Sequence, residues 1–455
     1  MTTPLRAGAA KTNISPALGI QIAGDIGRYR PCTGVADPIY ARALALETEG
    51  RKFCLLSLDL LAIDDAWTEE IRRRAAQTYG LPAEAVMIHV TQNHGAPCLG
   101  NHFCRDSCRL IPEKHAWLRG GDLRYNEPAA AGALDAMGRA LGQLTPVTVA
   151  AGRAIDGRVA FTRRYVMRDG TALCQPPICD PNILQVEGPA DPEVSVVTLT
   201  AANGQVVAAL LHHTCHPCNG FWGNEAMPDW PGAWCTEMEA HFGPGCTPLV
   251  VNGCCGNIIH RNYLNPDEPE LKDYRLLGRQ LAESTKRALA RLTPIPAAPV
   301  RWASEILSLP RRPVPTDVLA KAQQLLRANP EPIWKDEIRV TWEWVYAVGI
   351  VDIAEEQSRP FPYELQGLRI GDFALLAVGG EPFAETQLGI KRESPFAFTQ
   401  LAHMSNGFVG YIPTKRALAG GGYETNIGRG SRLHADCAEL IEQAGVKFLQ
   451  KLRQP

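Results

Sequence analysis

Short hydrophobic runs alternate with amphipathic segments along most of the chain. The segment KFCLLSLDLLAI at 52–63 has the pattern of a short buried strand, and AVMIHVTQNHGAP at 85–97 resembles a second strand that runs into a polar turn. Between them, AWTEEIRRRAAQTYG at 66–80 places its charges on one helical face and ends at a glycine, which predicts a helix. The segment at 193–216 predicts a hairpin that turns at Ala-Asn-Gly.

The remaining pattern continues the same alternation. A strand followed by a Gly-rich turn is predicted at 245–257, and a hairpin that ends at Gly-Gly-Glu is predicted at 365–383. Helices are predicted at 128–144, 271–292, 316–328, 334–357 and 436–452. Interleaved strands and helices predict an α/β fold of mixed α+β layers, with mixed sheets flanked by helices. The chain has no internal repeat and no Gly/Ser-rich linker, so we expect one domain over residues 1–455.

Composition narrows the function classes. The 455 residues are 45% hydrophobic and 21% charged, with a formal net charge of −2, which gives no reason to expect nucleic acid or an anionic membrane as partner. The longest apolar runs, such as 206–211, are too short for a transmembrane segment. The N-terminal stretch lacks the apolar region of a signal peptide, so we expect a cytoplasmic protein with fourteen reduced cysteines. Oligomeric state stays open.

Four polar turns that follow predicted strands carry possible metal ligands: TQNHGAP (91–97), TCHPCNG (214–220), GCCGNIIH (253–260) and GGEPF (379–383). In open α/β sheets, sites collect where strand ends meet. Taken singly, each histidine is more commonly a buried, hydrogen-bonded residue and the glutamate a turn residue. Taken together, His94, His216 and Glu381 resemble the His2Glu set that holds a catalytic zinc ion in many hydrolases. Cys215 and Cys218 lack a second C-x2-C pair, which argues against a structural zinc knuckle.

At a larger scale, the chain resembles the catalytic domain of the neutral (non-lysosomal) ceramidases and their shorter bacterial relatives, which lack a C-terminal immunoglobulin-like domain. The turn TQNHGAP is similar to the family's THTHSGP. The stretches that carry the resemblance keep the family's order: 8–24, 33–47, 54–61, 91–97, 161–170, 216–232, 379–396 and 405–424. The resemblance implies a ceramidase-like fold, a bound Zn²⁺ ion and hydrolysis of an amide bond.

The resemblance also implies roles for individual residues. His216, Glu381 and Tyr411 take the places of metal ligands. Arg163 in FTRR and Tyr423 in GGYE match residues that line the family's site, and a cation there could stabilise a developing oxyanion. Asp229 matches an aspartate that could orient a ligand histidine or a substrate hydroxyl. His212 lies two alternations before His216 on the same predicted strand, so we expect it behind the ligand or at the substrate.

Two departures from the family pattern affect the chemistry. The first histidine of the family's H-T-H turn is Gln92 here, so either His94 or Gln92 completes the metal site; imidazole suits zinc better, and we expect His94 as ligand and Gln92 near the substrate. In GCCGNIIHRN, Asn257 replaces an aspartate and Ile259 a serine. A serine nucleophile is therefore excluded at that position, and Asn257 is a candidate for binding substrate.

We therefore expect a zinc-dependent hydrolase that acts on an amide or ester bond of an N-acylated or polar small molecule. A long polar segment at 100–127 follows the His94 turn and, if it covers the pocket, favours a polar substrate. Two alternatives stay open. One is a hydrolase of glycosidic or other non-amide bonds, for which Glu225, Asp229 and Glu381 offer carboxylates. The other is a metal-free binding protein, which the Gln92 departure would predict.

Overall fold

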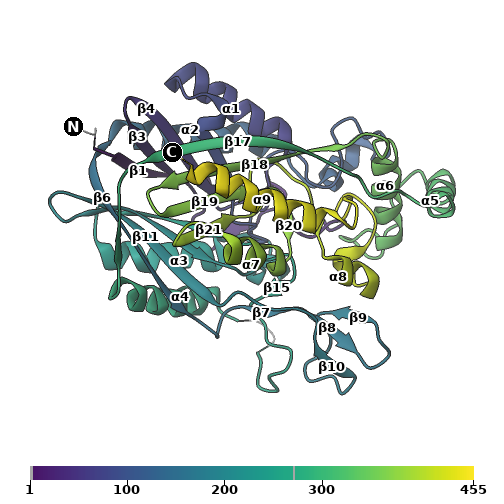
Figure 1. Ribbon diagram of the computed structural model, residues 1–455. Coiled ribbons are helices and arrows are strands. Elements are labelled where there is room, and N and C mark those ends of the chain that lie inside the picture. The colour runs from purple at the N-terminus through teal and green to yellow at the C-terminus, as the bar shows by residue number, and fades with distance from the viewer. Residues whose placement is uncertain (1–3, 270–271, 455) are drawn as a thin grey trace.

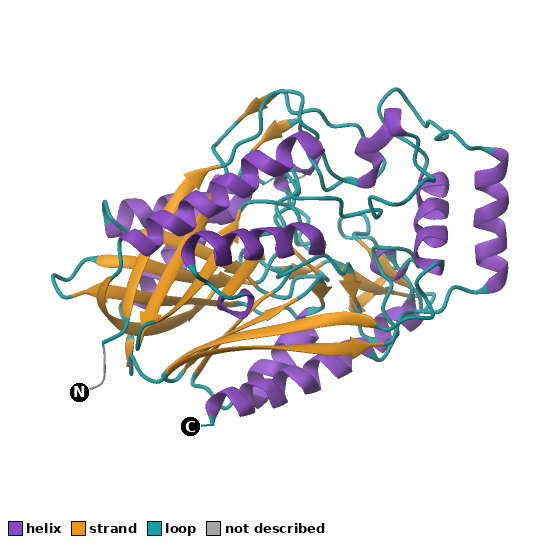
Figure 2. Cartoon of the chain, turned by 90° about the horizontal axis from the view of Figure 1, so that it is seen from above, coloured by secondary structure: helices purple, strands orange, loops and turns teal. Residues whose placement is uncertain are grey.

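The computed structural model describes residues 4–269 and 272–454 and has four layers. Two β-sheets pack face to face in the middle, and helices cover the outer face of each sheet (Figures 1 and 2). The predicted α/β class of mixed sheets flanked by helices is confirmed. No helix in the described part of the chain has the length and apolar character needed to cross a bilayer.

The larger sheet mixes parallel and antiparallel pairs. Within the described residues its strands follow the order β14 (Thr247–Asn252), β12 (Val206–His213), β11 (Glu193–Ala201), β6 (Thr145–Ile155), β1 (Arg6–Asn13), β3 (Tyr40–Thr48), β4 (Arg51–Leu58) and β5 (Val86–Val90), and β16 (Thr293–Ile295) pairs with β6. The pairs β12–β14 and β4–β5 are parallel. The smaller sheet has the order β17 (Val300–Leu309), β18 (Phe361–Ile370), β19 (Phe373–Val378) and β21 (Phe398–Ala402).

Helices cover the sheets on the two outer sides. On the larger sheet lie α1 (Asp65–Tyr79), α2 (Leu123–Gly142), α3 (Asp229–Phe242) and α4 (Tyr274–Leu289). On the smaller sheet lie α7 (Ala384–Glu393) and α9 (Cys437–Arg453). The remaining units stand at one end of the molecule, at the right of Figure 1: α5 (Thr316–Ala328), α6 (Trp342–Ala354), α8 (Lys415–Gly420) and the small sheet of β8 (Arg164–Met167), β9 (Ala172–Cys174) and β10 (Ile183–Val186).

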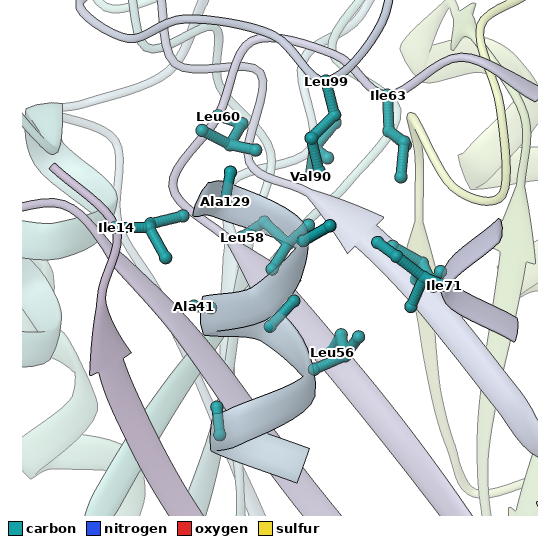
Figure 3. Close-up of a cluster of buried hydrophobic side chains, with 14 of the residues drawn as sticks. Ile14, Ala41, Leu56, Leu58, Leu60, Ile63, Ile71, Val90, Leu99 and Ala129 are labelled. Carbon is teal, nitrogen blue, oxygen red and sulfur yellow. The ribbon is translucent and has the colours of Figure 1, made fainter. Parts of the chain in front are cut away.

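The central strands are apolar on both faces because both faces are buried. In β3, Ala41, Ala43 and Ala45 face α1 and α2, whereas Leu44 and Leu46 face the smaller sheet. Successive side chains point to opposite faces, and both faces are buried. The sequence of such a strand is therefore a continuous hydrophobic run rather than an alternation of polar and apolar residues. Figure 3 shows the helix-facing cluster, in which Leu56 and Leu58 of β4 lie beside α2, the helix that carries Ala129.

Small residues bring α2 unusually close to β1. A Cβ added at Gly8 would lie 2.2 Å from the carbonyl oxygen of Ala140, a backbone atom that cannot rotate away. We expect Gly8→Ala to lower the free energy of unfolding by about 3 kcal/mol, since overpacking a rigid core is destabilising. Gly142→Ala is the matched control, because a Cβ there meets nothing within 4 Å; urea unfolding should show no loss for it. Equal midpoints for the two variants would contradict the close packing.

Most predicted elements are present, with shifted ends. Helix α1 begins after Asp64, whose side chain accepts a hydrogen bond from the Trp67 amide, and ends at Gly80 in the left-handed region (φ 68°). The helix predicted at 128–144 begins earlier, at Leu123, and residue 271 of the helix predicted at 271–292 lies outside the described residues. Of the helix predicted at 334–357, only Trp342–Ala354 forms, because Trp334 and Val340 instead make a β-bridge.

Candidate active site

A pocket of about 380 Å³ lies at the end of the molecule where the peripheral units gather. Its walls come from loops that are far apart in the sequence, from Gly24 near the N-terminus to Tyr423 near the C-terminus. Of the site residues expected from the sequence, His94, Arg163, Tyr411 and Tyr423 line this pocket. The segment 100–127 contributes no residue to the lining among the described residues, so the condition under which it would favour a polar substrate is not met.

Two buried histidines stand side by side at the pocket. The ring centroids of His94 and His216 are 5.7 Å apart. Each ring has its Nδ1 atom fixed by a backbone carbonyl, His94 by Gly24 at 2.9 Å and His216 by Cys255 at 2.6 Å. In both rings Nε2 is buried and has no hydrogen-bond partner among the described residues. Such a backbone bond to Nδ1 sets the tautomer in which Nε2 is a free acceptor, as in metal-ligating histidines.

A glutamate and a tyrosine reach the same place through one pair of strands. In the parallel pair β20 (Glu381–Pro382) and β22 (Tyr411–Ile412), Glu381 is the partner of Tyr411. The Glu381 Oε2 atom lies 3.3 Å from His216 Nε2, and the Tyr411 ring stacks on the His216 ring at 6.4 Å. Both the Tyr411 hydroxyl and the Gln92 amide hydrogen-bond to the Glu381 carboxylate. Gln92 therefore contacts a candidate ligand rather than the pocket space.

Burial determines the protonation states of the two histidines and shifts that of Glu381. It lowers the pKa of His94 and of His216 to about 3, so both rings are neutral at pH 7. It raises the pKa of Glu381, although Arg163, the Gln92 amide and His94 all favour the ionised carboxylate. Neutral imidazoles beside a carboxyl group are the donor set that zinc prefers.

The donor atoms of His94, His216 and Glu381 can be compared with the needs of a bound metal ion. His94 Nε2, His216 Nε2 and Glu381 Oε2 are three buried donor atoms that lack hydrogen-bond partners in the described part of the chain. As they stand, no three His, Cys, Asp or Glu side chains among the described residues have the mutual spacing of a metal site. The donor chemistry therefore fits a zinc ion, and the spacing requires the side chains to close in around it.

Arg163 provides a fixed positive charge at the pocket wall. Its Nη2 donates to the carbonyl of Gly256 at 2.6 Å, and its Nε lies 2.8 Å from Glu424 Oε1. The guanidinium also stands over the ring of Tyr411 at 5.3 Å. Glu424 holds Arg164 as well, at 2.6 Å, which ties β8 to the C-terminal loop. These contacts place a cation next to the candidate donor atoms.

Six expected site residues lie outside the pocket lining of the described chain: His216, Glu381 and Gln92, which lie behind the lining residues His94 and Tyr411, and Asp229, Asn257 and His212, which have other roles. Asp229, buried at the start of α3, accepts hydrogen bonds from the amides of Asn219, Gly220 and Trp230 rather than from a histidine. It therefore holds the loop that carries Phe221 and Trp222. The Asn257 side chain accepts from Ala384 N and donates to Glu385, which leaves it no atom for substrate. His212 is fully buried, and among neighbouring charges Lys391 and Asp191 act on it most strongly.

The pocket contains residues that the sequence analysis missed. Phe221, Trp222 and Trp342 form an aromatic rim, and Tyr423 packs edge-on against Trp342 at 6.4 Å. His260 and Arg261, which directly follow GCCGNII, form another part of the wall. Glu225, named for the glycosidic alternative, is not among the described lining residues, and neither is Asp229, so these carboxylates offer no acid–base pair at the pocket. The sequence gives only a weak signal for the aromatic rim and for His260 and Arg261, because single aromatic and basic residues in loops have no periodic pattern.

Comparisons with known proteins agree with this fold. No family model matches the chain, and no curated protein matches it. Among solved structures, a ceramidase complexed with C2 superposes with a TM-score of 0.74 at 16% identity, over 99% of this chain and 75% of that one. A neutral ceramidase from Pseudomonas aeruginosa superposes with a TM-score of 0.73 at 17% identity, over 99% of this chain and 74% of that one. The chain therefore has the fold of the neutral ceramidases, as the sequence resemblance predicted.

Proposed function

We propose that the protein is a metal-dependent hydrolase that cleaves a linear amide bond of an N-acylated small molecule. The observation that carries the proposal is the group of three buried donor atoms, on His94, His216 and Glu381, that stand without hydrogen-bond partners beside a lined pocket in the described part of the chain. Leaving such atoms unpaired in a folded protein is costly, so a ligand is expected to satisfy them. Two solved structures that superpose on this chain are ceramidases, which supports amide cleavage.

The residues present suit this chemistry. His94, His216 and Glu381 would hold a zinc ion, with Tyr411 next to Glu381. Zinc supplies Lewis acidity, which polarises a carbonyl oxygen and acidifies water. In the net reaction, water adds to the amide carbon, the C–N bond breaks, and the amine leaves with one proton from that water.

The chain's own polar groups stabilise the charge that develops. Arg163, buried and fixed by Gly256 and Glu424, faces the pocket with a permanent positive charge. The hydroxyl of Tyr423, which lines the same pocket, adds a second donor. Preorganised donors of this kind commonly contribute about 10²–10³-fold each to the rate of acyl transfer. Glu424 holds the Arg163 guanidinium in place through the reaction.

The test combines metal content with a substrate panel. Purified protein is stripped with a chelator, reloaded with Zn²⁺, and assayed for release of fatty acid or short carboxylate from N-acyl amides and matched esters, with ceramide included. We expect about one zinc per chain after reloading, and amide hydrolysis that chelation removes and zinc restores. Full amide hydrolysis in the stripped protein would overturn the metal-dependent mechanism. Zinc binding with no cleavage of any amide would overturn the assignment to amide bonds.

A further inference from the structure

Arg261 is a pocket residue whose charge has no partner of opposite sign among the described residues. It follows β15 (Ile258–Ile259), and its guanidinium lies 5.4 Å from the centre of the Tyr263 ring. Within the described residues it makes no ion pair and no side-chain hydrogen bond, and its Nε atom is buried without a partner. Stacking on Tyr263 holds the guanidinium plane while leaving its N–H donors free.

The neighbouring charges are already paired. Arg163 is held by Glu424 at 2.8 Å, and Lys272 by Glu268 at 2.7 Å. Asp25, which lines the same pocket, lies 3.6 Å from Arg28. Arg261 thus stands out as a cation that faces the pocket without a carboxylate of its own among the described residues.

A second, independent feature lies next to it. His260 is only 7% exposed and lines the same pocket, and its Nδ1 atom is buried without a hydrogen-bond partner in the described part of the chain. The surrounding wall is largely apolar, with Ile259, Phe221 and Trp222 among its residues. Charged hydrogen bonds are stronger in such surroundings than in water. Because the ring also bonds the His216 backbone, the neutral His260 leaves Nδ1 as an acceptor, so the hydrogen-bond donors for an anionic ligand group come from Arg261.

We infer that Arg261 forms a subsite for a carboxylate on the substrate, so that the preferred substrate is an N-acyl amide with a carboxylate on one of its arms. This inference rests on the proposed amide hydrolysis. A planar carboxylate can accept two N–H donors from one guanidinium. A dianion such as phosphate fits less well, because a single free arginine would face it and Asp25 lies in the same wall.

The test uses two probes that differ in one group: 4-(butanoylamino)benzoate, which carries the carboxylate, and 4-(butanoylamino)benzamide, which is neutral and nearly the same shape. Butanoate release is measured for the zinc-loaded protein and for Arg261→Gln, Arg261→Lys and Arg291→Gln. Arg291 is an exposed control, outside the pocket and without an ion pair among the described residues. We expect Arg261→Gln to lower kcat/KM for the benzoate by about 10- to 100-fold, through KM, and to lower it far less for the benzamide, whose neutral carboxamide carries no charge to pair with Arg261. Arg261→Lys should keep part of the preference, and Arg291→Gln all of it.

A binding measurement separates this inference from the proposed function. Calorimetric titration with 4-aminobenzoate, the product of the first probe, requires no catalysis. If Arg261→Gln weakens the binding of 4-aminobenzoate by about 10-fold or more, the subsite is supported. If neither probe is cleaved in that case, only the assignment as an amide hydrolase fails. Cleavage of both probes at equal efficiency by the parent protein and Arg261→Gln, with equal binding of 4-aminobenzoate, would overturn the subsite and leave the hydrolase standing.

Discussion

Glu381→Gln is expected to abolish hydrolysis while leaving the protein folded. The substitution keeps the shape of the side chain but removes the negative charge that lies 3.3 Å from His216 Nε2. An amide is a far weaker zinc ligand than a carboxylate, so we expect kcat/KM to fall by at least about 10³-fold, and the zinc content of the purified protein to fall with it. Burial raises the pKa of the Glu381 carboxyl, which means that the ionised form is costly there, so the variant should unfold at no lower a temperature than the parent metal-free protein.

Glu385→Gln is the matched control for this variant. Glu385 lies one helical turn further on, in α7, and accepts a hydrogen bond from Asn257 at 2.9 Å. It is also a largely buried glutamate with a raised pKa, but it is not among the pocket residues of the described chain. Zinc content and kcat/KM should stay close to those of the parent protein. Equal losses in the two variants would mean that Glu381 acts through the stability of this region rather than as a ligand.

The second large effect is a loss of stability in acid to which the buried ring of His89 contributes. This buried ring has both nitrogens occupied: Nδ1 donates to the His403 carbonyl at 2.7 Å, and Nε2 accepts from the Asn252 amide at 3.0 Å. A second proton would turn the acceptor into a donor facing an N–H group. Burial accordingly lowers the pKa of His89 to about 4, from 6.5.

The sign of the effect follows from these two values. Because the pKa is lower in the folded state, the unfolded chain takes up the proton first as pH falls. The contribution of His89 to stability is therefore complete above pH 6.5 and is lost progressively as the pH falls. By about pH 4 this loss amounts to about 3 kcal/mol. Glutamine keeps a donor and an acceptor. In urea unfolding, His89→Gln should therefore lose about that much less unfolding free energy than the parent protein between pH 6.5 and pH 4. His241→Gln, at an exposed position in α3, should follow the parent curve; a shallower slope for it alone would contradict the assignment to His89.

Much of the fold could be predicted because its physical causes are local. The helix at 66–80 has its cap and its terminal glycine in the sequence itself, and the strands have hydrophobic runs that only doubly buried strands need. Asp229 shows where this fails. The stretch Asp-Trp-Pro-Gly has the composition of a turn, yet it begins α3, with Asp229 in the left-handed region (φ 51°). Three backbone amides donate to its carboxylate, and these contacts exist only in the assembled loop.

The candidate site, like the fold, could be predicted from the sequence only in part. Strand ends that carry His94, His216 and Glu381 could be recognised from the chain because the sheet brings such ends together. The roles of these residues in metal binding stay predictions. The partnership of Glu381 with Tyr411 depends on a two-residue parallel pair across about thirty positions, which no local pattern indicates. The wall formed by His260 and Arg261 was equally hidden, because a loop has no periodicity from which its direction could be inferred.

The spread of the pocket walls from Gly24 to Tyr423 also affects how the protein is made. Contacts between such distant segments have a high contact order, and they form late in folding. A nascent chain emerging from the ribosome has no pocket until the loop around Tyr423 has docked against Arg163 and Trp342. Cleavage by a protease in any one wall loop would likewise disconnect the pocket while leaving the sandwiched sheets in place. The pocket can thus be assembled only after nearly the whole chain has been synthesised, and a cut in one wall loop would separate its parts.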